Sequence, residues 1–201
     1  MIPSADDGIV VEGRITVSEH TRLTTDEYLA GEETLRPQEL VWGVVRDAPT
    51  PHPRHQRAVF RLAGLMAAHV RAGDLGEVFL SPLDVVLDEA RALVVQPDIF
   101  FVAKDRLRIV SDRVRGAPDL AVEILSPRPR IWTLGERLGW FATYGVRECW
   151  VVHQLSAWVE VVAFAEGQVG SRQRFAAAER VESRVLPGFP HCFADFVSPD
   201  W

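Results

Sequence analysis

Residues 119–127 read DLAVEILSP, an apolar run with one acid, Glu123, at its centre. A second run, residues 97–102, reads PDIFFV and places Asp98 directly after a proline. Short runs of this kind, rich in β-branched and aromatic residues, predict buried β-strands. An ionised carboxylate in such a strand is costly unless it is paired, hydrogen-bonded or bound to a metal. The two acids therefore predict one shared cation site.

Each acid also has an ordinary structural interpretation. Asp98 is then a turn residue, and Glu123 is a core or sheet-edge acid that hydrogen bonds satisfy. Glu39 lies in a third predicted strand, and this recurrence favours the functional interpretation. Mg²⁺ needs only one or two protein carboxylates, completed by waters and substrate phosphate oxygens. The six histidines lack the spacing of a zinc site.

The rest of the sequence alternates helical and strand patterns. Helices are predicted over residues 24–31, 55–72 and 133–144. The first and last of these helices begin with capping boxes, formed by Thr24 with Glu27 and by Thr133 with Glu136. Further strands are predicted over residues 39–45, 77–80, 84–87, 148–152 and 158–164. This order predicts an α/β fold with a mixed β-sheet flanked by helices.

Length and composition indicate one domain. With 201 residues and 47% hydrophobic content, the chain can bury a full core. No run of eighteen apolar residues is present, and residues 1–22 lack the apolar stretch of a signal peptide. We expect residues 1–21 to be an N-terminal extension and residues 22–201 to be the domain. We also expect a cytoplasmic protein without a membrane partner.

The net charge of −6 is concentrated at one end of the chain. Residues 1–40 hold nine acids and three arginines, whereas residues 41–201 hold nineteen charges of each sign. A charge-balanced body is compatible with a polyanionic partner. Arginines surround the Glu123 strand at Arg106, Arg108, Arg113, Arg115, Arg128 and Arg130. They form either a band that neutralises DNA phosphates or a solvated charged face.

Several short strings carry a family resemblance through their order and spacing. They are Gln96-Pro97-Asp98-Ile99, Gly116-Ala117-Pro118-Asp119-Leu120, Glu123-Ile124-Leu125-Ser126-Pro127, Leu134-Gly135-Glu136-Arg137-Leu138 and Glu148-Cys149-Trp150-Val151-Val152, with His55-Gln56 and Pro82-Leu83-Asp84-Val85 upstream. In these strings the chain resembles the Uma-type family of putative restriction endonucleases, which belongs to the PD-(D/E)XK nuclease superfamily. The resemblance extends over residues 22–196.

This resemblance implies a restriction endonuclease-like fold and a Mg²⁺-dependent endonuclease that hydrolyses DNA phosphodiester bonds, with Mn²⁺ as a substitute. Asp98 would match the motif aspartate and Glu123 the (D/E), both as metal ligands. Glu39 would match a further acid near the site. The family's lysine comes from the helix that follows, at the position of Arg137. A homodimer is an analogy with this nuclease class.

The chain departs from the family pattern at its catalytic lysine. Arg137 stays protonated, so it cannot act as a base, although it can clamp a phosphate and stabilise negative charge. Thr133, Phe141 and His153 also stand where family members carry aspartate, tyrosine and aspartate. Two hypotheses follow: an endonuclease in which Arg137 replaces the lysine, or a catalytically inactive relative that acts as a nucleic-acid-binding or regulatory partner.

Other residues with chemical potential have structural interpretations. His55 is predicted to be structural at a helix start, His153 to be a turn residue, and Trp150 to be a core residue. The sequence holds neither a glycine-rich phosphate loop nor a Ser/His/Asp ordering, which disfavours an unrelated α/β enzyme that acts on small molecules.

Overall fold

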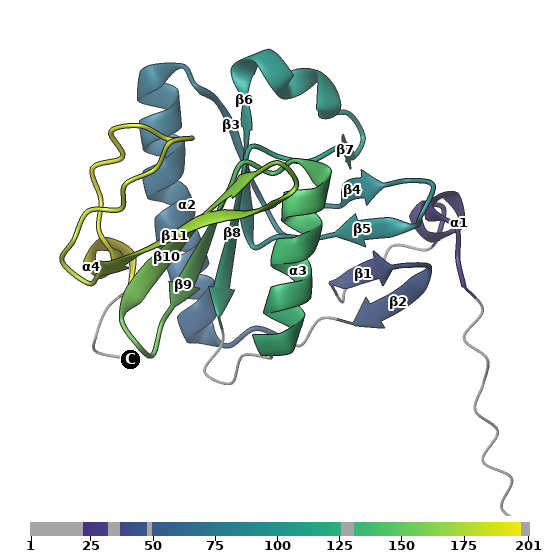
Figure 1. Ribbon diagram of the computed structural model, residues 1–201, viewed down its shortest axis with the longest axis horizontal. Coiled ribbons are helices and arrows are strands. Elements are labelled where there is room, and N and C mark those ends of the chain that lie inside the picture. Colours follow the sequence, from purple (N-terminus) through teal and green to yellow (C-terminus); the bar gives the residue numbers. More distant parts are fainter. Residues whose placement is uncertain (1–21, 32–36, 48–49, 126–130, 198–201) are drawn as a thin grey trace, which may run out of the picture.

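Two β-sheets and two long helices make up the domain (Figure 1). The computed structural model describes residues 22–31, 37–47, 50–125 and 131–197, with residues 131–133 described by their backbone alone. The predicted extension over residues 1–21, together with Arg128 and Arg130, lies outside the described residues. Within the described part, none of the helices is long and apolar enough to cross a membrane.

The larger sheet has six strands in the order β11-β10-β9-β8-β6-β3. They are Gln168–Ala176, Trp158–Ala165, Glu148–His153, Leu120–Leu125, Ile99–Ala103 and Gly76–Leu80. Strands β8 and β9 run parallel and the other neighbours run antiparallel, so the predicted mixed sheet is confirmed. Asp98 directly precedes β6 and Glu123 lies inside β8, as the sequence predicts.

The smaller sheet has five strands in the order β2-β1-β5-β4-β7. They are Val44–Asp47, Gln38–Val41, Leu93–Val95, Val85–Asp88 and Val114–Arg115. The single strand predicted over residues 39–45 is wrong, because Trp42 and Gly43 form a tight turn that makes it a hairpin of β1 and β2. Both turn residues have positive φ, 54° and 81°, as a two-residue hairpin turn requires.

Two helices cover opposite faces of the six-stranded sheet. Helix α2 (Pro53–Gly73) packs through Leu62 and Met66 against one face of β8, and α3 (Ile131–Tyr144) packs through Leu138 and Phe141 against the other. This alternation follows from the strand, whose successive side chains point to opposite faces. Shorter helices are α1 (Thr25–Leu29), η1 (Lys104–Ile109) and α4 (Phe193–Phe196).

The two predicted capping boxes have different outcomes. The first is confirmed: the Thr24 hydroxyl accepts from the Glu27 N–H at 3.2 Å, and the Glu27 carboxylate accepts from the Thr24 N–H at 2.8 Å. The second is wrong, because α3 begins at Ile131 and Thr133 is therefore inside the helix.

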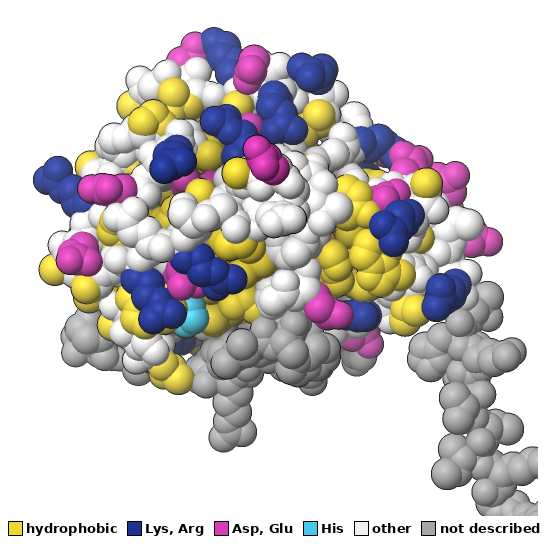
Figure 2. Space-filling model, viewed as in Figure 1, with side chains coloured by type: hydrophobic (Ala, Val, Ile, Leu, Met, Phe, Trp, Pro, Cys, Tyr) yellow, Lys and Arg dark blue, Asp and Glu magenta, His cyan; other side chains and the backbone are white. Residues whose placement is uncertain are grey.

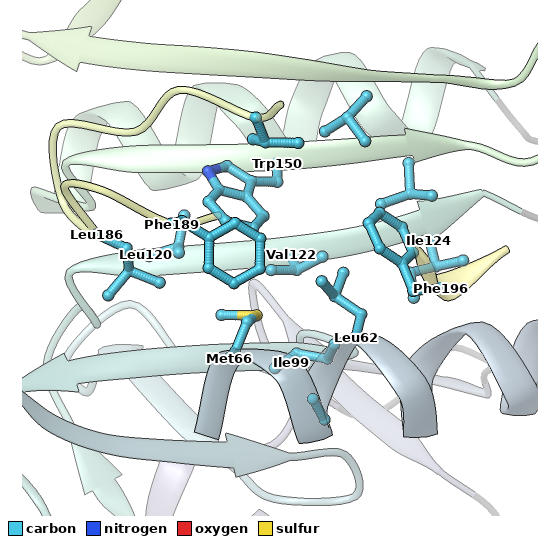
Figure 3. Packing of buried hydrophobic residues seen from close by; sticks show 14 of the residues in the cluster. Leu62, Met66, Ile99, Leu120, Val122, Ile124, Trp150, Leu186, Phe189 and Phe196 are labelled. Atoms are coloured by element: carbon cyan, nitrogen blue, oxygen red, sulfur yellow. The ribbon is translucent and has the colours of Figure 1, made fainter. Parts of the chain in front are cut away.

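The C-terminal segment, residues 181–197, packs against the core on the α2 side of the six-stranded sheet. Figure 3 shows the Phe189 ring beside the indole of Trp150 of β9, with Met66 of α2 on the other side of Phe189. Trp150 is fully buried, which confirms its predicted core position. Burying each large apolar side chain contributes roughly 1.5–3 kcal/mol. This packing fixes α2 against β8 and so fixes the side chains at the start of the helix.

Candidate functional site

The site is centred on Asp98, which directly precedes β6, and on Glu123 of the neighbouring strand β8. In the antiparallel pair of β6 and β8, Ile99 faces Val122, so the preceding Asp98 comes opposite Glu123. The Asp98 Oδ2 atom also accepts a hydrogen bond from the Ile124 N–H at 2.7 Å. The structure therefore brings together the two acids that the sequence places on separate buried strands.

Arg137 and Glu39 complete the group of predicted site residues. The Arg137 Nε–H donates to Glu123 Oε1 at 2.5 Å, and its NH1 group donates to Glu39 Oε1 and Oε2 at 2.8 and 2.9 Å. These three side chains are only 14–18% exposed. Arg137 thus bridges a carboxylate of the six-stranded sheet and a carboxylate of the five-stranded sheet. Its guanidinium carbon also lies 5.6 Å from the ring centre of the buried Phe141.

His55 is a site residue that the sequence prediction missed. Its Nε2 atom lies 3.1 Å from Asp98 Oδ2, and its side chain is 13% exposed. Burial lowers the pKa of His55, but the hydrogen bond and the charge of Asp98 outweigh this effect and raise the pKa above its ordinary value. The available sequence signal was the His55-Gln56 string, which is one of those that carry the family resemblance.

The site holds more negative than fixed positive charge. Burial raises the pKa of Glu123 to about 8, and the nearby Asp98 and Glu39 add to this rise, while Arg137 opposes it. Although burial disfavours the charged guanidinium, Glu123 and Glu39 raise the pKa of Arg137 above its ordinary value, so it remains a cation. Because three carboxyl groups share the site with one permanent cation, an additional positive charge would be stabilised here.

A second group of contacts holds Glu39 and the link between β5 and β6. The Gln96 N–H donates to Glu39 Oε1 at 2.7 Å, and the Gln96 side-chain amide donates to Asp84 Oδ1 at 2.8 Å. Asp84 in turn pairs with Arg113 at 3.3 Å. Gln96, two residues before Asp98, is therefore held through both its backbone N–H and its side-chain amide.

A hard divalent cation fits the donor set of this site. No group of three or more His, Cys, Asp or Glu side chains poised for a metal occurs in the described part of the chain. Mg²⁺, however, needs only one or two carboxylates. Both hydrogen bonds to Asp98 fall on Oδ2, and the bond to Glu123 falls on Oε1. Among the described residues, none donates a hydrogen bond to Asp98 Oδ1 or to Glu123 Oε2. These two oxygens are therefore available as ligands of a metal ion.

The arginines near the Glu123 strand are largely engaged within the protein. Arg106 pairs at 2.9 Å with the fully buried Asp119, and Arg115 pairs with Glu89 at 3.3 Å. Arg113 pairs with Asp84, as described above. Figure 2 shows dark blue and magenta side chains interspersed on one face of the molecule. These pairs favour the structural interpretation of the three arginines over a dedicated phosphate band.

His153 differs from its predicted place. It is the last residue of β9 and not a turn residue, and its ring stacks on Trp158 with 3.4 Å between ring centres. Its neighbour Gln154 donates to the carbonyl of Leu125 at 3.1 Å, which ties the ends of β8 and β9 together. His153 is therefore part of a local aromatic stack.

Comparisons with known proteins bear on the family and the fold of the chain. A family model described as Uma2, putative restriction endonuclease, matches residues 25–192. Among curated proteins, none matches the chain. Among solved structures, the chain is similar to the crystal structure of a putative nuclease belonging to DUF820 from Anabaena variabilis. The TM-score is 0.73 at 20% identity, over 88% of this chain and 98% of that one. This likeness confirms the predicted α/β fold class.

Proposed function

This chain belongs to the Uma2 family of putative restriction endonucleases, and from that membership we propose that it hydrolyses DNA phosphodiester bonds with the help of Mg²⁺ or Mn²⁺. One observation carries the proposal. Asp98 and Glu123 face each other across β6 and β8, each with one carboxylate oxygen that no described residue engages. DNA as the substrate and the divalent ion as the cofactor are both part of this proposal.

Each side chain has a distinct proposed role. Asp98 and Glu123 would hold the ion through Oδ1 and Oε2. A bound divalent ion supplies Lewis-acid chemistry: it acidifies a water and stabilises negative charge on the phosphate. Glu39 would orient Arg137, whose planar guanidinium would stabilise charge on the reacting phosphate. Arg137 stays protonated, so it would not remove a proton from the attacking water.

The test is DNA cleavage with Mg²⁺ or Mn²⁺ by the wild type and by Asp98→Asn and Glu123→Gln. Both substitutions keep the volume of the side chain and remove its charge. We expect each to reduce the cleavage rate by about 100-fold or more, the scale of one electrostatic contribution to catalysis. Glu77→Gln, at an exposed acid of β3, is the matched control and should leave the rate unchanged. If both variants cleave DNA at the wild-type rate, the assignment of Asp98 and Glu123 as metal ligands is wrong.

A specific observation favours the second candidate function, a catalytically inactive nucleic-acid-binding or regulatory partner. The Arg137 guanidinium is already engaged within the protein by Glu123 and Glu39. If the wild type binds DNA and does not cleave it, this second function is supported. If the Arg137→Lys variant then cleaves DNA, the absence of a lysine at residue 137 explains why the wild type does not. The predicted homodimer stays a prediction, which sedimentation of the full chain can test.

A further inference from the structure

We propose that His55 is a positioning residue that selects which oxygen of Asp98 is presented to a metal ion. The inference rests on the proposed function, since it concerns the carboxylate that would bind the ion. It adds a residue outside the predicted set of Asp98, Glu123, Glu39 and Arg137. The geometry that supports it is the convergence of two donors on one oxygen of Asp98.

The first step concerns the two hydrogen bonds. The backbone N–H of Ile124 and the Nε2 atom of His55 both reach Asp98 Oδ2, at 2.7 and 3.1 Å. An ionised carboxylate can only accept, so His55 must carry its hydrogen on Nε2. Two donors from different directions hold the carboxyl plane more firmly than one. Because both donors bind Oδ2, they fix the orientation of the carboxylate. The other oxygen, Oδ1, then points in one defined direction and has no donor from either group.

The second step concerns how the helix holds His55 in place. It is the third residue of α2, whose buried side chains Ala58, Leu62 and Met66 pack against the six-stranded sheet. Its neighbour Arg54 donates to the carbonyl of Gln154 at 2.9 Å, so the start of the helix is also tied to the end of β9. The imidazole is therefore presented from a rigid element, as the precise orientation of a ligand requires.

The third step is the size of the expected effect. Groups that orient a metal ligand without touching the metal typically change metal affinity by about 10–100-fold when they are removed. A purely structural histidine would change stability instead and leave the affinity of the folded protein unchanged. Metal affinity therefore separates the two roles.

The experiment is calorimetric titration of the full chain with Mn²⁺, without DNA. His55→Met keeps a similar volume and removes the donor, and we expect Mn²⁺ to bind about 10–100-fold more weakly. His55→Gln places an amide N–H near the position of Nε2, and we expect it to restore most of the affinity. His69→Met, on the same helix but four turns away, is the control and should bind Mn²⁺ like the wild type.

The outcomes separate this inference from the proposed function. A wild type that takes up no Mn²⁺ overturns the proposed function itself. A wild type that binds, together with a His55→Met variant of equal affinity, overturns only the role of His55. A His55→Gln variant as weak as His55→Met also overturns it, because the donor would then not matter. If His55→Met does not fold, His55→Asn takes its place, since its shorter amide cannot reach Asp98.

Discussion

Arg137 joins the two sheets of the domain at the level of a single side chain. Its guanidinium binds Glu123 through Nε and Glu39 through NH1, so one planar group donates hydrogen bonds to carboxylates of both sheets. A lysine ammonium is a compact point charge on a flexible stem and lacks this fixed fork. Arg137 therefore has a structural function in addition to its proposed catalytic one.

Removing Arg137 should destabilise the fold strongly. Arg137→Met leaves Glu123 and Glu39 as unpaired carboxylates that are only 14% and 18% exposed. Breaking a buried ion pair from one side costs about 3–5 kcal/mol. We expect a loss of about 3 kcal/mol in the free energy of unfolding, measured by urea denaturation. Arg46→Met breaks the exposed pair with Glu136 and should cost less than about 1 kcal/mol. Equal losses in the two variants would contradict the prediction.

Glu148 is another buried acid, and its contacts indicate a structural role. Its carboxylate accepts hydrogen bonds from the Trp150 indole at 2.7 Å, from the Ser183 hydroxyl at 2.5 Å and from the Arg184 N–H at 3.0 Å. Glu148→Ala leaves these donors without their acceptor, at about 1–3 kcal/mol for each group that stays buried. We expect a loss of about 3 kcal/mol in thermal unfolding, with DNA cleavage retained below the transition. Glu182→Ala, at an exposed neighbour, should lie within about 0.5 kcal/mol of the wild type.

Strands β6 and β8 position the site at the level of secondary structure. The register of this pair places Asp98 opposite Glu123, and β3 supports β6 from its other edge. The close approach of β3 to β6 depends on Gly76, which has a φ of 148°. A Cβ atom there would lie 2.1 Å from the Val102 carbonyl oxygen. The pairing of β3 with the Ala103 end of β6 therefore depends on this glycine.

Two glycine substitutions should have opposite effects. Gly76→Ala must displace the backbone of β3 or β6, so we expect it to lower the unfolding free energy by about 2–3 kcal/mol, the range of strongly destabilising substitutions. Gly64→Ala lies in the middle of α2, where an added Cβ meets nothing within 4 Å. Alanine should stabilise the helix there by about 0.5–1 kcal/mol. Urea denaturation measures both, and effects of the same sign would refute the argument.

The whole molecule is organised around the junction of its two sheets. Figure 1 shows α3 beside both the six-stranded sheet and the strands of the smaller sheet. The link of residues 96–98 passes from β5 to β6 at this junction, and Glu39 reaches it from β1. A cation bound between Asp98 and Glu123 would add positive charge at the junction. Ion binding should therefore stabilise the entire fold.

Divalent ions should raise the thermal unfolding temperature of the chain. A ligand that binds only the folded state at 100 times its Kd adds about 2.7 kcal/mol to the unfolding free energy. We expect Mn²⁺ or Mg²⁺ to raise the Tm and an excess of EDTA to reverse the rise, measured by calorimetry. In Asp98→Asn the rise should be absent or much smaller. The same rise in wild type and Asp98→Asn would place the ion elsewhere on the molecule.

Local patterns determined which elements form and which acids they carry. The apolar runs around Asp98 and Glu123 predicted β6 and β8, and the spacing of Thr24 and Glu27 predicted the start of α1. The three strands missed by the prediction, β5, β7 and β11, lacked such a pattern, and β7 is only 2 residues long. Strand β5 is only 3 residues long, and β11 exposes nearly all of its residues, so neither shows the alternation of a half-buried strand.

Contacts between distant residues were decided only by the tertiary structure. His55 is 43 residues from Asp98, and Glu39 is 98 residues from Arg137. Whether such side chains meet depends on strand register and on which face of the sheet each helix covers, and these depend on the packing of the whole core. The sequence thus determined the chemical groups and the elements that carry them. Tertiary packing decided that His55 faces Asp98 and that Arg137 lies between Glu123 and Glu39, because hydrogen bonds form only where packing brings donor and acceptor within about 3 Å.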